Sequence, residues 1–194
     1  MKKLLVLVFA IALCLGVLCV GASADGITPS QPQKGDGTAE NPYQIGTAEN
    51  LYWFAGLVNG DTSIIGSDTP QNTAANAVLT KDITINTDVL NKVQSDNTTG
   101  LQSWTPIGEY GKNGEKAYTG TFDGQGHTIS GLYYDGNGNY VGLFGYVYDG
   151  GRVQNVNVAD SYISNSYGGT SYTGGVCGRN LSGDLTNCSF DGSV

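Results

Sequence analysis

The chain has 194 residues, of which 39% are hydrophobic and only 13% charged, and it carries a formal net charge of −8 at pH 7. This balance excludes a nucleic-acid-binding protein, because phosphate binding needs clustered Lys and Arg, whereas the two arginines, Arg152 and Arg179, are isolated. The 30 glycines and 12 tyrosines exceed ordinary globular usage and predict a strand-rich, turn-dense domain.

Residues 1–24 have the three parts of a secretory signal peptide. Lys2 and Lys3 precede an apolar run from residue 4 to residue 20, and the small residues Ala22-Ser23-Ala24 follow. We therefore expect cleavage near Ala24 and a secreted or cell-surface protein. The alternative is a membrane anchor, but the run is at the short limit for a span and no basic cluster follows, so no membrane span is expected in the mature chain.

A helix is expected near the start of the folded region. Residues 25–36 contain prolines and no periodic apolar pattern, which predicts a flexible leader before a domain of residues 37–194. After a short strand at 43–45, Thr47 is placed to cap a helix of about 47–59 that Gly60 would end. Its apolar residues recur at i, i+3, i+4 and i+7, so we expect it to cap the N-terminal end of a stacked-strand core. Those residues are Leu51, Phe54, Ala55 and Val58, with Trp53 on the flank.

Two polar stretches, residues 61–75 and 87–103, are expected to be long surface loops. Between them, residues 77–85 are expected to form two short strands with Leu79, Ile83 and Ile85 facing inward. The core is then expected to resume at residues 104–108.

From residue 118 onward, one pattern occurs three times. A short glycine-containing segment is followed by a strand-like segment with hydrophobic residues at fixed positions. The second and third copies are 32 to 33 residues apart, and the first and second copies are 24 apart. Such spacing predicts a solenoid whose loops vary in length more than its strands do. The copies are Gly120–Phe122 with Thr128–Tyr134, Gly142–Gly145 with Arg152–Val158, and Gly175–Gly178 with Asp184–Phe190.

Alignment of the copies predicts three columns of inward side chains, which require stacked parallel strands. Gly131, Asn155 and Asn187 interrupt the alternation, so we expect left-handed backbone there and a hydrogen-bonded ladder between the two asparagines. The chain stops directly after the third copy, which predicts an open edge that further repeats or self-association would cover. The predicted columns are Ile129/Val153/Leu185, Leu132/Val156/Cys188 and Tyr134/Val158/Phe190.

Gly142-Leu143-Phe144-Gly145 and Gly175-Val176-Cys177-Gly178, each followed by a hydrophobic-x-Asn-hydrophobic strand, resemble the GLUG repeat of bacterial secreted and cell-surface proteins. The resemblance covers about residues 37–194, although Asp123 replaces the second glycine in the first copy. It implies an all-β fold, a single-stranded parallel β-helix, of the kind found in adhesin-like proteins and in non-catalytic regions of immunoglobulin-A peptidases. It implies no catalytic residues.

The residues themselves give little support to catalysis. His127 is the single histidine, which excludes the paired histidines of a zinc peptidase. A β-helix polysaccharide lyase or glycoside hydrolase remains the alternative, because such folds carry carboxylate pairs on an outer face. Among five acids of the repeats, four precede glycine, as turn residues do, and no two share an outward column, so no catalytic residue is predicted. These acids are Asp123, Asp135, Asp149, Asp160 and Asp191.

Residues 135–139 contain the alternating oxygen side chains of a calcium loop, Asp135, Asn137 and Asn139. The glycine and the bidentate glutamate of such a loop are missing, so no metal site or cofactor is expected beyond weak calcium binding there. Cys177 and Cys188 are the only cysteines after the predicted signal peptide. A secreted pair favours a disulfide, but both occupy inward positions that suit any small apolar residue, and both interpretations remain open.

Outward Tyr133, with Tyr148 and Tyr162 in or near loops, offers flat faces to sugar rings or to a protein. Together with the outward Asn157, these are the candidate ligand-binding residues. The leading hypothesis is a non-enzymatic module that binds a glycan or a host or neighbouring surface protein. The alternatives are the β-helix enzyme named above and a purely structural repeat spacer of a larger surface protein.

Overall fold

The computed structural model describes residues 26–111 and 116–194, so the predicted signal peptide lies outside the described residues. The described part is mostly strands, and none of its helices is long and apolar enough to cross a membrane. The helices are α1 (Ala48–Asn59), α2 (Thr62–Ile65) and α3 (Val89–Gln94). The strands are β1 (Tyr43–Ile45), β2 (Ala77–Leu79), β3 (Ile83–Thr84), β4 (Thr121–Asp123), β5 (Thr128–Ser130), β6 (Tyr133–Gly136), β7 (Tyr140–Val141), β8 (Phe144–Tyr148), β9 (Arg152–Gln154), β10 (Asn157–Asn165), β11 (Tyr172–Thr173), β12 (Cys177–Leu181), β13 (Asp184–Thr186) and β14 (Ser189–Ser193).

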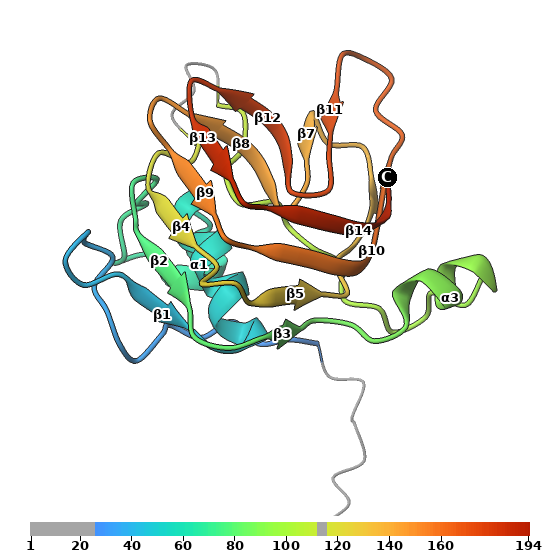
Figure 1. Cartoon of the computed structure of the whole chain (residues 1–194), viewed down its shortest axis with the longest axis horizontal. Coiled ribbons are helices and arrows are strands. Elements are labelled where there is room, and N and C mark those ends of the chain that lie inside the picture. The colour runs from blue at the N-terminus through green and yellow to red at the C-terminus, as the bar shows by residue number, and fades with distance from the viewer. Residues whose placement is uncertain (1–25, 112–115) are drawn as a thin grey trace, which may run out of the picture.

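All pairings between these strands are parallel. One sheet has the order β1-β2-β4-β9-β13, and a second has the order β14-β10-β5-β3 with β6 also beside β10. Two smaller sheets pair β11 with β7 and β12 with β8. The chain passes through β4, β5, β7 and β8, then β9, β10, β11 and β12, then β13 and β14, so each pass lays its strands beside those of the pass before (Figure 1).

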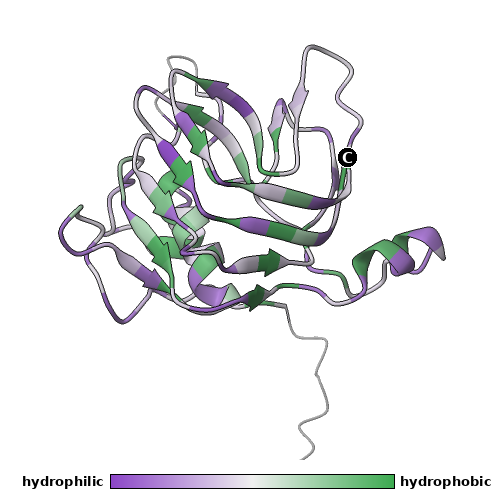
Figure 2. Ribbon diagram, in the orientation of Figure 1, coloured by the Kyte–Doolittle hydropathy of each residue, from purple (hydrophilic) through white to green (hydrophobic). Residues whose placement is uncertain are grey.

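Inward residues of successive passes stack in columns. The predicted pairs Val153 with Leu185 and Val158 with Phe190 are confirmed by the strand register. A further column joins Ile83 to Ile129, and Figure 2 shows β3 and β5 as hydrophobic there. Because each residue lies on its counterpart, the apolar interior is continuous from one pass to the next.

The predicted position of the first copy is wrong. Ile129 stacks on Val158 rather than on Val153, because Phe122 occupies the Val153 column. The reason is the corner before β5: seven positions separate Phe122 from Ile129, whereas five separate Val153 from Val158. The other two predicted partners shift in the same way, since Leu132 N contacts Ser161 Oγ and Tyr134 lies opposite Ile163.

Aromatic rings fill the centre of the core. The Phe122 ring lies 6.0 Å from that of Phe54 and 5.3 Å from that of Phe144, and the Tyr118 ring lies 5.1 Å from that of Phe144. All four side chains are fully buried. Edge-on and tilted contacts of this kind add to the free energy of burying the rings, so helix α1 and the strands form one core.

Helix α1 begins and ends as predicted. Thr47 Oγ1 accepts a hydrogen bond from Asn50 N at 3.2 Å, and Gly60 adopts left-handed backbone with a φ of 68°. Trp53, which was expected on the flank of the apolar stripe, is only 4% exposed and packs edge-on against Tyr43 of β1 at 5.3 Å. The Tyr43 ring also lies 6.4 Å from that of Phe54 in the stripe, so this tyrosine contacts both the stripe and its flank.

The last residue of α1 substitutes for a neighbouring strand. Asn59 Nδ2 donates to Pro106 O at 2.9 Å, and Asn59 Oδ1 accepts from Gly108 N at 2.8 Å. These are the hydrogen bonds that a parallel strand would make to residues 106–108. A buried asparagine side chain thus satisfies backbone groups that would otherwise lose their partners.

The two predicted loops contain α2 and α3. Figure 1 shows α3 projecting from the strands at the side of the molecule. Asp160 anchors its first turn, because the Asp160 carboxylate accepts from Val89 N at 3.1 Å and from Leu90 N at 3.2 Å. Residues 26–36 also contact the folded part, with Ser30 N donating to Glu49 O of α1 at 3.1 Å.

Candidate functional site

A column of tyrosines lies on the outer side of the small sheets. The register of β7 and β11 places Tyr140 opposite Tyr172, with ring centroids 5.4 Å apart. Tyr110, from the preceding pass, meets Tyr140 edge-on at 5.4 Å. Tyr110 is 51% exposed and Tyr172 is 40% exposed, so these apolar ring faces are open to solvent along three passes of the chain.

The neighbouring pair of strands adds a cation. Strands β8 and β12 place Tyr146 opposite Arg179. The Arg179 Cζ lies 5.6, 5.5 and 5.1 Å from the ring centroids of Tyr140, Tyr146 and Tyr172, and Arg179 Nη1 donates to the Tyr140 hydroxyl at 2.9 Å. That hydrogen bond raises the pKa of Arg179 above its ordinary value. Tyr148, from the same strand as Tyr146, lies 5.7 Å from its ring. We call this set the tyrosine face: Tyr110, Tyr140, Tyr146, Tyr148, Tyr172 and Arg179.

A pocket of about 340 Å³ opens beside Tyr140 and Tyr110. Its lining combines aromatic rings with an amide and a carboxylate, which is the mixture expected where a ligand has apolar faces and hydroxyl edges. Trp104 lies in this lining, and the hydrogen bond that its Nε1 donates to Gly142 O at 3.0 Å fixes the position of its ring. The lining residues are Trp104, Thr105, Pro106, Glu109, Tyr110, Tyr134, Gly138, Asn139 and Tyr140.

The polar groups of this pocket are partly unsatisfied. Asn139 Oδ1 is buried and has no hydrogen-bond partner among the described residues. Glu109 Oε2 lies 3.3 Å from Lys116 Nζ. A buried acceptor without a donor costs about 1–3 kcal/mol, so a ligand hydroxyl that met this oxygen after a turn of the Asn139 side chain would recover part of that free energy.

The residues predicted as ligand-binding lie in three different settings. Tyr133 and Tyr162 form a stacked pair, with centroids 6.1 Å apart and an interplanar angle of 18°. Tyr148 belongs to the tyrosine face. Asn157 is engaged within the protein, because its Nδ2 donates to Gly126 O at 3.2 Å and its Oδ1 accepts from Ser189 Oγ at 2.8 Å.

Sequence reasoning did not select Tyr110, Tyr140, Tyr172 or Arg179. A usable signal is present: Tyr140 and Tyr172 are 32 residues apart, the spacing of the second and third copies. Residues at that spacing stack in a solenoid, so a pair of aromatic residues there forms a continuous surface.

The predicted asparagine ladder is confirmed. Asn187 Nδ2 donates to Asn155 Oδ1 at 2.8 Å, and both residues have left-handed backbone, with φ of 52° and 53°. Asp123 extends the ladder by one pass, since its carboxylate accepts from Asn155 Nδ2 at 3.0 Å and from Gln154 Nε2 at 2.9 Å. Asp123 therefore stabilises the stack.

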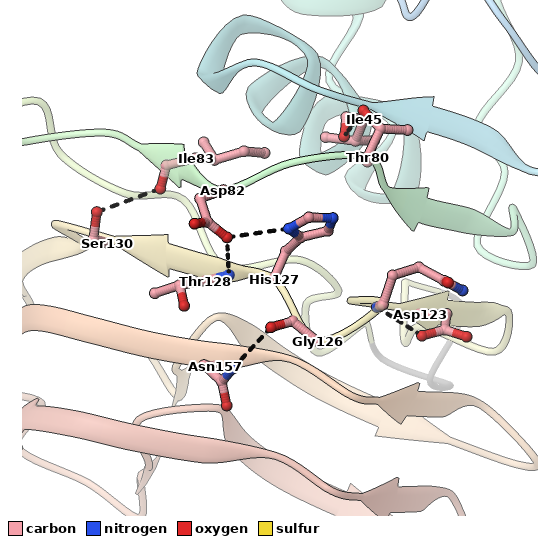
Figure 3. A network of polar contacts seen from close by, with 11 residues as sticks. Ile45, Thr80, Asp82, Ile83, Asp123, Gly126, His127, Thr128, Ser130 and Asn157 are labelled. Carbon is pink, nitrogen blue, oxygen red and sulfur yellow. Dashed lines mark hydrogen bonds and ion pairs between the residues drawn. The ribbon is translucent and has the colours of Figure 1, made fainter.

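Figure 3 shows a second carboxylate that joins two passes of the chain. Asp82 Oδ1 accepts from Thr128 N at 2.9 Å and lies 3.1 Å from His127 Nδ1. The hydrogen bond from Thr128, then that from His127, hold the pKa of Asp82 below its ordinary value. Burial acts to raise the pKa of Asp123, but hydrogen bonds from Asn155, Gln125 N and Gln154 outweigh it and lower that pKa.

These depressed pKa values predict loss of stability in acid. A carboxyl whose pKa is lower in the folded state stabilises the protein above its unfolded pKa, near 3.8, and that contribution is lost as the pH falls through the folded value. We expect the urea midpoint to fall between about pH 5 and pH 3, and Asp123→Asn to flatten this dependence. Asp149→Asn, at an exposed turn, is the control. A slope that Asp123→Asn leaves unchanged would contradict the assignment.

The cysteines and the acidic side chains are the remaining candidates for chemistry. Cys177 and Cys188 are free thiols, and burial raises the pKa of Cys177 to about 12. In residues 26–111 and 116–194, no three His, Cys, Asp or Glu side chains gather as metal ligands. A larger hollow of about 640 Å³ near the start of α1 is lined by polar side chains such as Gln31, Lys34 and Glu49, without an aromatic ring.

Comparison with known proteins identifies one family model. The model of the GLUG motif matches residues 169–194. The chain is 31% identical over 171 residues to Halomucin of Haloquadratum walsbyi, which covers 88% of this chain and 2% of Halomucin. It is 29% identical over 158 residues to a Gly-rich membrane protein of Evansella cellulosilytica, which covers 81% of this chain and 15% of that protein. No solved structure matches the chain. The predicted resemblance to GLUG-repeat proteins is confirmed.

Proposed function

We propose that this chain, which carries the GLUG motif, is a non-catalytic module that binds a glycan through the tyrosine face and its pocket. The pocket beside Tyr140 is the observation that carries the proposal: it joins exposed rings to the buried, unpartnered Oδ1 of Asn139. Sugar rings present apolar C–H faces and hydroxyl edges. Tyrosine rings take up the faces, and amide and carboxylate oxygens accept from the hydroxyls.

The proposed scaffold is a single-stranded parallel β-helix with α1 as its N-terminal cap. Two observations support it: successive passes visit the sheets in one order, and every strand pairing between described strands is parallel. The capping role is supported by Asn59, whose side chain forms hydrogen bonds with Pro106 O and Gly108 N in the place of a further strand. A stack of this kind presents the tyrosines of successive passes as one surface.

The proposed location is outside the cell or on its surface. The composition of residues 1–24 supports export, and one of the similar proteins is described as a membrane protein. This chain spans a small share of both relatives, so the module is proposed as one part of larger surface proteins of this kind.

The lining of the pocket favours binding without cleavage, because it contains a single acid. Glycosidic hydrolysis uses two carboxyl groups that flank the scissile bond, about 5–9.5 Å apart. Glu109 is the only acid among the residues that line the pocket, and it lies beside Lys116. We therefore propose that bound sugar is retained and not hydrolysed.

A glycan array with the full chain tests this function. We expect wild type to bind a limited set of glycans and Tyr140→Ala to weaken that binding by at least roughly tenfold, because one stacking face and one hydroxyl are lost. Tyr133→Ala is the matched control, since it removes the same side chain from the other tyrosine pair. Thermal unfolding of each variant separates lost binding from lost folding.

The outcomes distinguish the alternatives. Selective loss in Tyr133→Ala would move the site to the Tyr133 and Tyr162 pair. Binding to no glycan would favour the structural spacer, and release of reducing ends from a bound glycan would identify an enzyme.

A further inference from the structure

Arg179 is a cation that forms no ion pair with the described residues. The other arginine, Arg152, lies 3.1 Å from Asp184, but no carboxylate of the described residues lies within ion-pair distance of Arg179. Its one side-chain hydrogen bond there goes to the Tyr140 hydroxyl. In a chain of net charge −8, an arginine whose described neighbours are tyrosines and not carboxylates retains most of its capacity to bind an anion.

The geometry holds the guanidinium in one orientation. Rings of Tyr140, Tyr146 and Tyr172 lie within 5.1–5.6 Å of its Cζ, and the Tyr140 hydroxyl fixes one of its nitrogens. An arginine has five N–H donors arranged as a planar fork, so donors remain for an incoming group. A carboxylate or sulfate matches that fork with two parallel hydrogen bonds.

Arg179 also lies next to the pocket, because both share Tyr140. Tyr140 contributes to both, since its ring lines the pocket and its hydroxyl accepts from Arg179 Nη1. A sugar chain that starts in the pocket and continues over Tyr140 towards Tyr172 therefore passes Arg179. The pocket and the arginine act as neighbouring subsites along the tyrosine face.

We propose that the glycan bound by the tyrosine face carries an acidic group, a carboxylate or a sulfate, and that Arg179 is the residue that recognises it. This inference rests on the proposed glycan-binding function. The rest of the chain is acidic and disfavours anionic ligands, so the local cation decides whether such a glycan is accepted. Binding should weaken with added salt, as a partly exposed ionic contact does.

The test uses four forms of one oligosaccharide, measured by calorimetry with the full chain. Unsulfated chondroitin carries carboxylates, chondroitin sulfate carries both groups, carboxyl-reduced chondroitin sulfate carries sulfate only, and carboxyl-reduced chondroitin carries neither. We expect at least one charged form to bind roughly tenfold or more tighter than the neutral form, as a charge-assisted hydrogen bond allows. The carboxylate-only and sulfate-only forms identify which group is recognised.

Two variants decide the role of Arg179. Arg179→Gln should abolish the preference for the charged forms over the neutral form, whereas Arg152→Gln, which removes the same charge elsewhere, should preserve it. Equal binding of charged and neutral forms by wild type, with Tyr140→Ala weakening both, would overturn this inference and keep the proposed function. A preference that survives Arg179→Gln would also overturn it. Binding of none of the four forms would overturn this inference, whereas the proposed function would be overturned by binding to no glycan on the array.

Discussion

Gly145→Ala is expected to destabilise the fold by at least about 3 kcal/mol, a large fraction of the stability of a small domain. A methyl group at Gly145 would overlap Gly108 O and would lie 2.9 Å from Tyr140 O. Both contacts are backbone atoms that cannot rotate away, so neighbouring passes of the chain would have to separate. Urea denaturation measures the loss, and soluble yield reports it if the variant does not fold.

Gly168→Ala is the control for this substitution. A methyl group there meets no atom within 4 Å, so its effect should stay within about 0.5 kcal/mol. Gly178, the corresponding glycine of the third copy, is crowded in the same way, with Val141 N at 2.6 Å from the added methyl and Tyr172 O at 2.7 Å. If Gly145→Ala folds with wild-type stability, close backbone approach is not the reason for the motif's glycines.

Phe122→Ala has the second large expected effect, a loss of about 3–5 kcal/mol of unfolding free energy. The ring is fully buried, contacts the rings of Phe54 and Phe144, and stacks on Val153 of the next pass. Its removal leaves a cavity between α1 and the strands that neither side can fill without moving. Denaturation in urea gives the free energy, and Phe122→Leu should recover much of it.

Phe190→Ala provides the comparison within the fold. Phe190 stacks on Val158 in the last pass and is only half-buried, so its truncation should cost less than half as much. Equal costs at the two positions would contradict the placement of Phe122 at the centre of the core.

Much of the fold could be predicted because repeated residues carry it. Val153 and Leu185, and Asn155 and Asn187, are 32 residues apart, and parallel strands paired in register place residues of such a repeat opposite each other. The register of the first copy was predicted wrongly because its corner before β5 contains two more residues than the corner before β10. An alignment of the repeated pattern does not detect those two residues, so it pairs the wrong strands. The burial of Trp53 was not predicted because it depends on a tertiary contact with Tyr43 of β1, and the periodicity of the helix gives no information on such contacts.

The site was harder to predict. A stack places Tyr140 beside Tyr172 through the same 32-residue period, but Tyr110 precedes the repeats and joins them only through the path of residues 104–110. Arg179 appeared isolated in the sequence, and the structure places it on three aromatic rings. Tyr133 and Tyr162 do pair, yet the strand alternation that selected Tyr133 and the loop position that selected Tyr162 give no information on which tyrosines border a pocket.

Chemical-shift mapping tests the central claim, that the tyrosine face is the glycan-binding surface. Backbone amide spectra of the ¹⁵N-labelled full chain would be recorded during titration with a glycan selected on the array. The account predicts that the largest changes cluster at Tyr110, Asn139, Tyr140, Tyr172 and Arg179. Changes centred on Tyr133, Asn157 and Tyr162, or spectra that do not change while the glycan is present in excess, would contradict it.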